Sequence, residues 1–144
     1  MKNDRFLVPL AVHLFLIDQE RILLLRRYNT GYEDGNYSLI AGHVDGKETV
    51  IQAIMREAKE EAGIVISEKD IEISQVMQRK SDDERIDYFL TCKKWEGEIK
   101  IMEPNKCDRL EWFPINSLPN NTIPYIQESV SKYLDGEKFT ILGF

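Results

Sequence analysis

The sequence predicts an α/β fold, an α/β/α sandwich in which helices cover both faces of a mixed β-sheet. Segments of strand-like composition precede and follow a charged stretch with helical spacing, and a second stretch with helical spacing lies near the end of the chain. The 144 residues are 42% hydrophobic and 31% charged, which is typical of a globular domain with a core of its own. We therefore expect a single domain over residues 1–144.

Apolar and β-branched runs between turn signals place the strands of this sheet. The first run, residues 7–17, ends at a polar turn over 18–20, and residues 21–27 return as its neighbour. Residues 28–37 are rich in Gly, Asn and Asp and predict a loop, and the charged stretch 79–84 predicts another. The predicted strands are residues 7–17, 21–27, 38–41, 71–78, 85–92, 98–102 and 110–113.

Two segments have the spacing of amphipathic helices. Residues 48–62 form the stronger one, with Thr49 as a candidate N-cap and Gly63 at the position where a glycine ends a helix. Residues 124–134 repeat apolar side chains every three to four positions and predict the closing helix. Together with the strands, these helices complete the predicted sandwich.

Charge and composition exclude several classes of function. There are 19 basic and 25 acidic residues, a net charge of −6, with no basic run that would bind a nucleic-acid backbone. No apolar run approaches the roughly 18 residues of a membrane span. The polar start, residues 1–5, does not resemble a signal peptide. Cys92 and Cys107 are not in a metal-binding pattern, and we expect free thiols in a reducing cytoplasm.

The first predicted helix carries three carboxylates on one flank. At about 100° per residue from Ile51, Glu57, Glu60 and Glu61 fall at about 240°, 180° and 280°, beside the apolar face. One interpretation is a solvated acidic face whose repulsion is softened by basic neighbours. The other is a hard cation held among the carboxylate oxygens, as Mg²⁺ requires.

The residues around these glutamates form a motif. It reads Gly42-x5-Glu48-x7-Arg56-Glu57-Ala58-x-Glu60-Glu61-x-Gly63-Ile64. This pattern resembles the Nudix box, the loop–helix signature of the Nudix hydrolases, at every fixed position. The order of strands and the closing helix are similar to that family over nearly the whole chain. The resemblance implies a Nudix fold and favours the cation over the solvated face.

The resemblance also implies roles for the box residues. Glu60 and Glu61 would be metal ligands, Gly42 would supply a carbonyl ligand, and Glu57 would be the general base or a further ligand. Members of the family differ in which glutamate deprotonates water, so that assignment stays open. The implied cofactor is Mg²⁺, with Mn²⁺ as a substitute, and the implied reaction is attack by water on a diphosphate linkage.

Arg56 falls on another side of the predicted helix, at about 140°. There it can pair with Glu48 and hold the preceding loop against the helix. We therefore group Arg56 and Glu48 with Glu57 as catalytic-site residues.

Three further features resemble the MutT-like branch of the family, which acts on nucleoside triphosphates. Arg26 and Arg27 end the second predicted strand, where that branch has a substrate-contacting arginine pair; the alternative is two solvated charges. Residues 95–98 resemble a hairpin of that branch. Glu103 lies where the branch supplies a metal ligand from outside the box, although a carboxylate in a loop is often merely solvated.

The resemblance thus predicts a cytoplasmic, Mg²⁺-dependent hydrolase of a small nucleotide substrate, without nucleic-acid or membrane partners. The favoured reaction converts a nucleoside triphosphate to the monophosphate and pyrophosphate. The alternatives are the same chemistry on ADP-ribose, a nucleotide sugar or another diphosphate, and a non-catalytic nucleotide-sensing module. An isoprenoid diphosphate isomerase is disfavoured by the complete set of box glutamates.

Overall fold

The structure is a computed structural model that describes residues 4–144. Over this part of the chain it contains eight strands, two α-helices and a short 3-10 helix. The strands are β1 (Leu10–Asp18), β2 (Arg21–Arg27), β3 (Tyr37–Ser38), β4 (Ile40–His43), β5 (Ile71–Lys80), β6 (Glu84–Cys92), β7 (Cys107–Pro114) and β8 (Phe139–Leu142). The helices are α1 (Val50–Ala62), η2 (Glu68–Asp70) and α2 (Pro124–Leu134).

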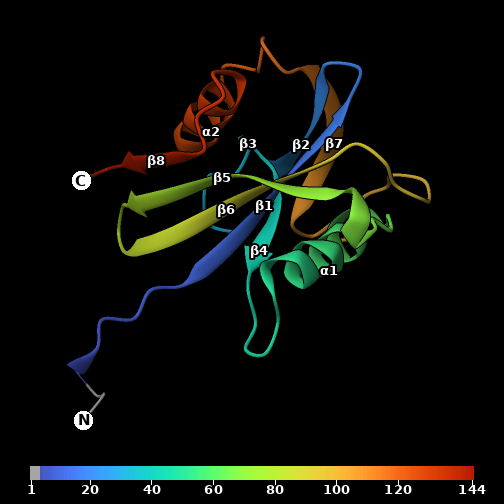
Figure 1. The fold of residues 1–144 in the computed structure, drawn as a ribbon. Coiled ribbons are helices and arrows are strands. Elements are labelled where there is room, and N and C mark those ends of the chain that lie inside the picture. The colour runs from blue at the N-terminus through green and yellow to red at the C-terminus, as the bar shows by residue number, and fades with distance from the viewer. Residues whose placement is uncertain (1–3) are drawn as a thin grey trace.

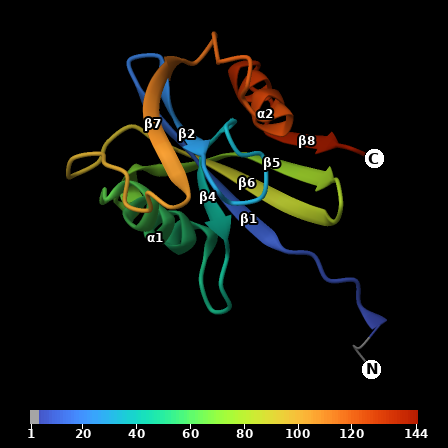
Figure 2. The ribbon, with the colours of Figure 1, turned by 180° about the vertical axis from the view of Figure 1, so that it is seen from behind.

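The strands form one mixed sheet. Its order is β3-β2-β1-β6-β5-β8, with β4 paired to β1 and β7 paired to β2. Strand β1 runs parallel to β6 and β5 runs parallel to β8, while the remaining pairs are antiparallel. Helix α1 lies on one side of the sheet and α2 on the other, as the two opposite views show (Figure 1 and Figure 2). The predicted α/β sandwich on a mixed sheet is confirmed.

Strand β1 shows how the sequence divides into two cores. Successive side chains of a strand point to opposite faces. Leu14 and Leu16 therefore pack in the cluster that contains the apolar face of α1, whereas Phe15 and Ile17 pack in the cluster that contains α2. Burying each such side chain contributes roughly 1.5–3 kcal/mol. An apolar run without polar alternation, as in residues 7–17, is what a strand covered on both faces requires.

The boundaries of α1 follow from its capping residues. Thr49 Oγ1 accepts a hydrogen bond of 3.0 Å from the Gln52 N–H, and Gln52 Oε1 accepts one of 2.9 Å from the Thr49 N–H. The helix stops at Gly63, whose φ of 71° suits a residue without a Cβ. The predicted cap and stop are confirmed. The helix begins at Val50 rather than at residue 48, so Glu48 belongs to the preceding loop.

The prediction of a strand at residues 98–102 is wrong, and so is the hairpin at 95–98. After β6 the chain runs without a strand as far as β7. The Lys100 N–H donates to the Ala62 carbonyl (3.1 Å), so this backbone satisfies the end of α1 instead of pairing with a strand. Trp95 packs beside Trp112, with ring centroids 5.7 Å apart.

Strand β8 was not predicted from the sequence. It is four residues long and pairs parallel to β5 at the edge of the sheet. Short edge strands carry a weak sequence signal, because only alternate side chains contact the protein. In the described part of the chain, no helix is long and apolar enough to span a membrane.

A buried ionic cluster lies between the sheet and α2. The side chain of His13 is 3% exposed and its Nε2 lies 2.9 Å from Asp87 Oδ1. Arg79 Nε donates to Asp87 Oδ2 at 2.7 Å. Burial alone would raise the pKa of Asp87, but the hydrogen bonds and charges of His13 and Arg79 outweigh it and hold that pKa below its ordinary value. His13 is thus a core histidine, as its position within an apolar strand indicates.

We expect Asp87→Asn to lower the free energy of unfolding by about 3–5 kcal/mol, because it leaves the buried Arg79 guanidinium without a counter-charge. Asp18→Asn is a control: it breaks the exposed Arg21–Asp18 pair and should cost less than about 1 kcal/mol. Since the pKa of Asp87 is depressed, its stabilisation is present above about pH 4 and is lost as the pH falls further. Urea unfolding at pH 7 measures the free energy of unfolding of both variants. Equal decreases in the two variants would contradict the expectation.

Candidate active site

The candidate site lies where β4 meets α1, and Gly42 permits the close approach of the two elements. A Cβ on Gly42 would overlap with the carboxyl group of Glu57. Any side chain at this position would therefore displace Glu57 from the strand. The glycine of the motif is explained by this contact, which also brings the backbone of β4 beside the acidic flank of α1.

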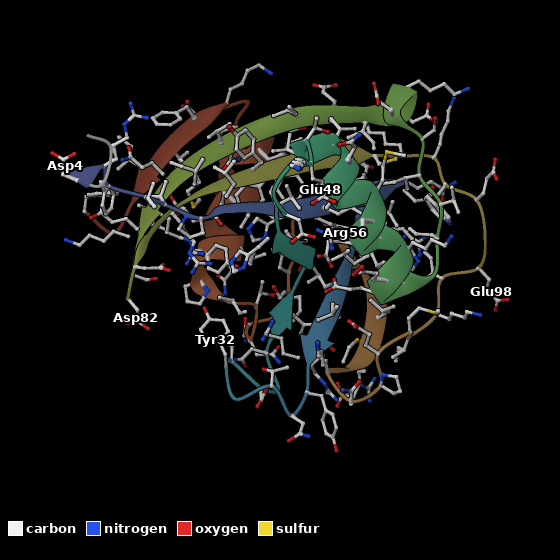
Figure 3. The ribbon with its side chains drawn as sticks, turned by 90° about the horizontal axis from the view of Figure 1, so that it is seen from below. Asp4, Tyr32, Glu48, Arg56, Asp82 and Glu98 are labelled. Carbon is white, nitrogen blue, oxygen red and sulfur yellow. The ribbon has the colours of Figure 1, made fainter. Side chains whose placement is uncertain are left out.

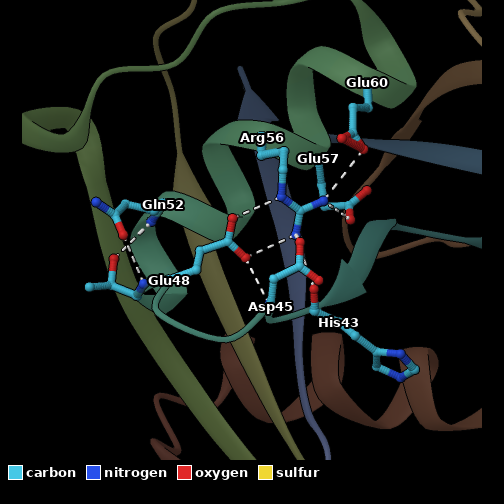
Figure 4. Close-up of polar contacts among 8 residues, drawn as sticks. His43, Asp45, Glu48, Gln52, Arg56, Glu57 and Glu60 are labelled. Atoms are coloured by element: carbon cyan, nitrogen blue, oxygen red, sulfur yellow. Dashed lines mark hydrogen bonds and ion pairs between the residues drawn. The ribbon is translucent and has the colours of Figure 1, made fainter.

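Arg56 is the centre of the polar contacts in Figure 4. Its Nε and Nη2 donate to the two carboxylate oxygens of Glu48 at 2.8 and 3.0 Å. Its Nη1 donates to Glu57 Oε2 at 2.8 Å, and Nη2 also donates to the His43 carbonyl at 3.1 Å. The guanidinium hydrogen bonds lower the pKa of Glu48 to about 2. The predicted Arg56–Glu48 pair is thus present, and it ties the loop before α1 to the helix.

Glu57 and Glu61 are the two inner carboxylates of the flank. Glu57 is 9% exposed, and Glu61 Oε1 accepts a hydrogen bond of 3.0 Å from the Ala41 N–H. Burial raises the pKa of Glu61 to about 8, although the Ala41 N–H opposes the shift. The charges of Glu57, Glu103 and Glu60 contribute to this rise. Burial also raises the pKa of Glu57, against the lowering effect of Arg56. Negative charge is therefore crowded in the interior of this cluster.

Glu103 joins the cluster from the loop before β7. A cavity of about 70 Å³ is lined by Glu61 and Glu103 together with Arg27. The Lys106 and Cys107 N–H groups donate to the Glu103 carbonyl at 2.9 and 3.1 Å, so a tight turn holds this loop. The fold therefore brings Glu103, a residue 42 positions beyond Glu61 in the sequence, to the same cavity.

The donor chemistry of this cluster fits a hard divalent cation. Carboxylate oxygens from Glu57, Glu60, Glu61 and Glu103 and the carbonyl of Gly42 are ligand types that Mg²⁺ prefers, and Mg²⁺ also keeps several waters. No ion pair reaches Glu61 within residues 4–144, so its half-buried charge lacks the partner that a cation would provide. Over the same residues, no three acidic, His or Cys side chains stand in a ready-made ligand arrangement.

Arg26 and Arg27, which form a pair in the sequence, are separated in the structure. Arg26 makes a bidentate ion pair with Asp108 on β7, with both N–O distances at 2.8 Å. Arg27 lines the cavity of Glu61 and Glu103, and its Nη2 donates to Thr30 Oγ1 at 3.0 Å. Because Arg26 is bound to Asp108, Arg27 is the member of the pair that lines the cavity.

Two polar residues of this cavity were not singled out from the sequence. Thr30 lies in the loop after β2, and Lys106 follows Glu103 by three positions. Pro104 and Asn105 are a turn signal that brings Lys106 back beside Glu103, where its N–H donates to the Glu103 carbonyl, and this signal could have identified it. Lys106 adds a second cation, beside Arg27, that can contact an anion in the cavity.

Comparisons with known proteins identify the family. The family model described as NUDIX domain matches residues 7–134. An ADP-ribose pyrophosphatase of Methanocaldococcus jannaschii is 30% identical over 110 residues, which are 76% of this chain and 63% of that protein. The 8-oxo-dGDP phosphatase NUDT18 of Mus musculus is 29% identical over 114 residues, 78% of this chain. The chain spans only 33% of the length of the mouse protein.

Solved structures share the fold at lower identity. A MutT NUDIX hydrolase from Burkholderia pseudomallei superposes with a TM-score of 0.80 at 23% identity, covering 88% of this chain and 98% of that one. A MutT protein from Methanosarcina mazei gives a TM-score of 0.74 at 16% identity, covering 89% and 94%. The matched NUDIX domain extends over most of the sequence and includes every residue of the acidic cluster, and the chain belongs to the Nudix hydrolase family.

Proposed function

We propose that the chain hydrolyses a phosphoanhydride bond in a nucleoside diphosphate-linked small molecule and that it depends on Mg²⁺, which Mn²⁺ can replace. The observation that carries this proposal is the convergence of Glu61, Glu103 and Arg27 on one cavity. Such a site combines carboxylates for a metal ion with a guanidinium for phosphate. An acidic cluster without a metal ion would repel the substrate.

The residues of the site divide between holding the metal and holding the substrate. Glu57, Glu60, Glu61, Glu103 and the Gly42 carbonyl would hold the cation. When bound, the cation neutralises phosphate charge and lowers the pKa of a water molecule. Arg27 and Lys106 bind phosphate oxygens. Arg56 is a positioning residue, because it acts through Glu48 and Glu57.

Within this class we propose a nucleoside triphosphate as substrate, with the monophosphate and pyrophosphate as products. A third phosphate adds charge that the two cations of the cavity, Arg27 and Lys106, can neutralise. Hydrolysis of ADP-ribose or another diphosphate is the second candidate, favoured by the relative from Methanocaldococcus jannaschii that is named an ADP-ribose pyrophosphatase. A sensing module without turnover would have no use for the complete set of carboxylates.

A phosphate-release assay with Mg²⁺ tests the proposal. The panel contains the nucleoside triphosphates, nucleoside diphosphates, ADP-ribose and nucleotide sugars, with coupled cleavage of pyrophosphate or of the released monophosphate. We expect turnover of triphosphates that stops when EDTA is added. Faster turnover of ADP-ribose would select the second candidate, and no turnover of any compound would reject the enzyme.

The proposed compartment is the reducing cytoplasm. Cys92 and Cys107 are both buried and unpaired in the structure. Burial raises the pKa of each thiol, which keeps it protonated and unreactive. Free thiols of this kind are typical of proteins that work in a reducing environment.

Glu103→Gln should raise the Mg²⁺ concentration needed for the half-maximal rate and lower the rate at saturating Mg²⁺. The substitution removes one of the carboxylates that face the cavity and keeps the shape of the side chain. The melting temperature of the metal-free protein should not change, because Glu103 is held by its backbone carbonyl. A Mg²⁺ titration of the variant that matches the parent would remove Glu103 from the metal site.

Arg27→Gln and Arg26→Gln should behave differently although the residues are neighbours. Arg27→Gln removes a charged donor from the cavity and should raise KM about tenfold or more. Arg26→Gln breaks an ion pair with Asp108 and should leave KM within about twofold. Steady-state kinetics of both variants measures the two KM values. Similar values would contradict the assignment of Arg27, and not Arg26, to substrate binding.

A further inference from the structure

A second cavity lies on the α2 side of the sheet. Its volume is about 420 Å³, large enough for a small ring, and its lining includes Tyr32, Arg79, Arg85 and Tyr125. Tyr32 belongs to the loop after β2, and Arg27 Nε donates to its carbonyl at 2.7 Å. This loop therefore borders both the cavity of the carboxylates and the second cavity. In Figure 3, Tyr32 and Asp82, both of which line the second cavity, lie on the same side of the molecule.

Arg79 presents a fixed donor group to this cavity. Its side chain is 8% exposed, and its guanidinium carbon lies 3.6 Å from the ring centroid of Tyr125. Nε is bound to Asp87, which His13 holds from the other side. The two Nη atoms donate to no side chain or carbonyl within residues 4–144. A planar guanidinium that is stacked and anchored in this way keeps its remaining N–H groups in one plane, ready for two neighbouring acceptors.

The charge of the cavity argues against an anionic ligand. Arg85 is neutralised by a bidentate pair with Asp83, with distances of 3.0 and 2.9 Å. Arg79 is neutralised by Asp87, and Asp82 adds a further negative charge to the lining. No net positive charge therefore remains for a phosphate or carboxylate. The ring of Tyr32, which is 51% exposed, instead offers a flat surface to an uncharged ring.

We propose that this cavity binds the non-phosphate end of the substrate, and that Arg79 selects an uncharged planar heterocycle with two adjacent acceptors on one edge. The O6 and N7 atoms of guanine and hypoxanthine form such an edge, and a guanidinium binds them with two parallel hydrogen bonds. Adenine has an amino group, a donor, beside N7, so it cannot accept both hydrogen bonds from the guanidinium. The inference rests on the proposed function, because the ring must be joined to phosphates that lie beside Arg27.

The test uses nucleosides, which carry no phosphate and need no metal ion. Inosine and adenosine are titrated separately into the metal-free protein, and the amide shifts of residues 81–85 are followed by NMR. Inorganic phosphate is titrated as a third probe. Because no hydrolysis is involved, the binding result is independent of the enzyme assay. The protein can be an active hydrolase that shows no preference for inosine, and it can prefer inosine even if no hydrolysis is detected.

We expect inosine to bind about tenfold more tightly than adenosine. Arg79→Lys should remove this preference, because a lysine cannot make the bidentate contact. Arg21→Lys is the matched control: Arg21 is also paired with an aspartate and lies over an aromatic ring, 5.3 Å from the centroid of Trp112, but outside the cavity. This control should keep the preference.

If Arg79→Lys fails to fold, Tyr32→Ala replaces it, since Tyr32 is 51% exposed. This variant should weaken both nucleosides and retain the preference for inosine. Equal affinity of the parent for inosine and adenosine would overturn the proposal, as would a preference that survives in Arg79→Lys. Shifts of residues 81–85 caused by phosphate rather than by nucleosides would also overturn it, and so would unchanged binding by Tyr32→Ala.

Discussion

Glu61→Gln should lower kcat by about a hundredfold or more at saturating Mg²⁺, while the protein stays folded. Metal ions contribute several kcal/mol of charge stabilisation in the transition state, and each 1.4 kcal/mol is a factor of ten in rate. Glu61 is one of the two inner carboxylates of the flank and lines the cavity that Arg27 and Glu103 also line. The amide keeps the shape of the side chain and its Oε1 can still accept the Ala41 N–H.

The melting temperature separates a functional role of Glu61 from a structural one. Burial and three nearby carboxylates disfavour a negative charge at this position, so an uncharged glutamine should leave the metal-free protein at least as stable as the parent. Glu98→Gln is the control, because Glu98 is exposed at the outer edge of the loop after β6 (Figure 3). It should change neither rate nor stability. Full activity of Glu61→Gln, or of the parent in EDTA, would refute the assignment.

The acidic flank of α1 could be predicted because helix geometry depends only on local spacing. Residues three and four apart share a face, so Glu57, Glu60 and Glu61 are neighbours in any helix that includes them. Glu48 lies in the loop directly before the Thr49 cap, only eight positions from Arg56, so their contact is also local. Regular periodicity thus predicts the local half of the site.

The other half depends on contacts between distant segments. The sequence gives no reason to prefer Arg26 or Arg27 as the substrate-contacting residue. The pairing of β2 with β7 shows that Arg26 forms an ion pair with Asp108, 82 positions away. The anchoring of Arg79 by Asp87 likewise requires the register of β5 on β6. Single-residue differences in register exchange the two faces of a strand, so local patterns do not reveal them.

The wrong strand at residues 98–102 has a related cause. Its apolar residues alternate with polar ones, as in a half-buried strand. The carbonyl groups at the end of α1 need donors, and the Lys100 N–H meets one of them. The Lys100 N–H therefore donates to the end of α1 instead of to a neighbouring strand. The same loop carries Glu103 to the cavity.

Arg56→Lys should lower kcat roughly ten- to a hundredfold and lower the melting temperature. A lysine retains the positive charge but cannot contact Glu48, Glu57 and the His43 carbonyl together, as the guanidinium does in Figure 4. The loop that carries Gly42 would then shift against α1, and displacements of about 1 Å at a reacting centre can cost a hundredfold in rate. Arg109→Lys is the control, because Arg109 makes one exposed ion pair, to Glu111 at 3.1 Å, and should lose neither rate nor stability. Kinetics and thermal unfolding are measured for both variants. If Arg56→Lys keeps the rate and melting temperature of the parent, the guanidinium does not position the site, and the contacts that it makes with the loop are incidental.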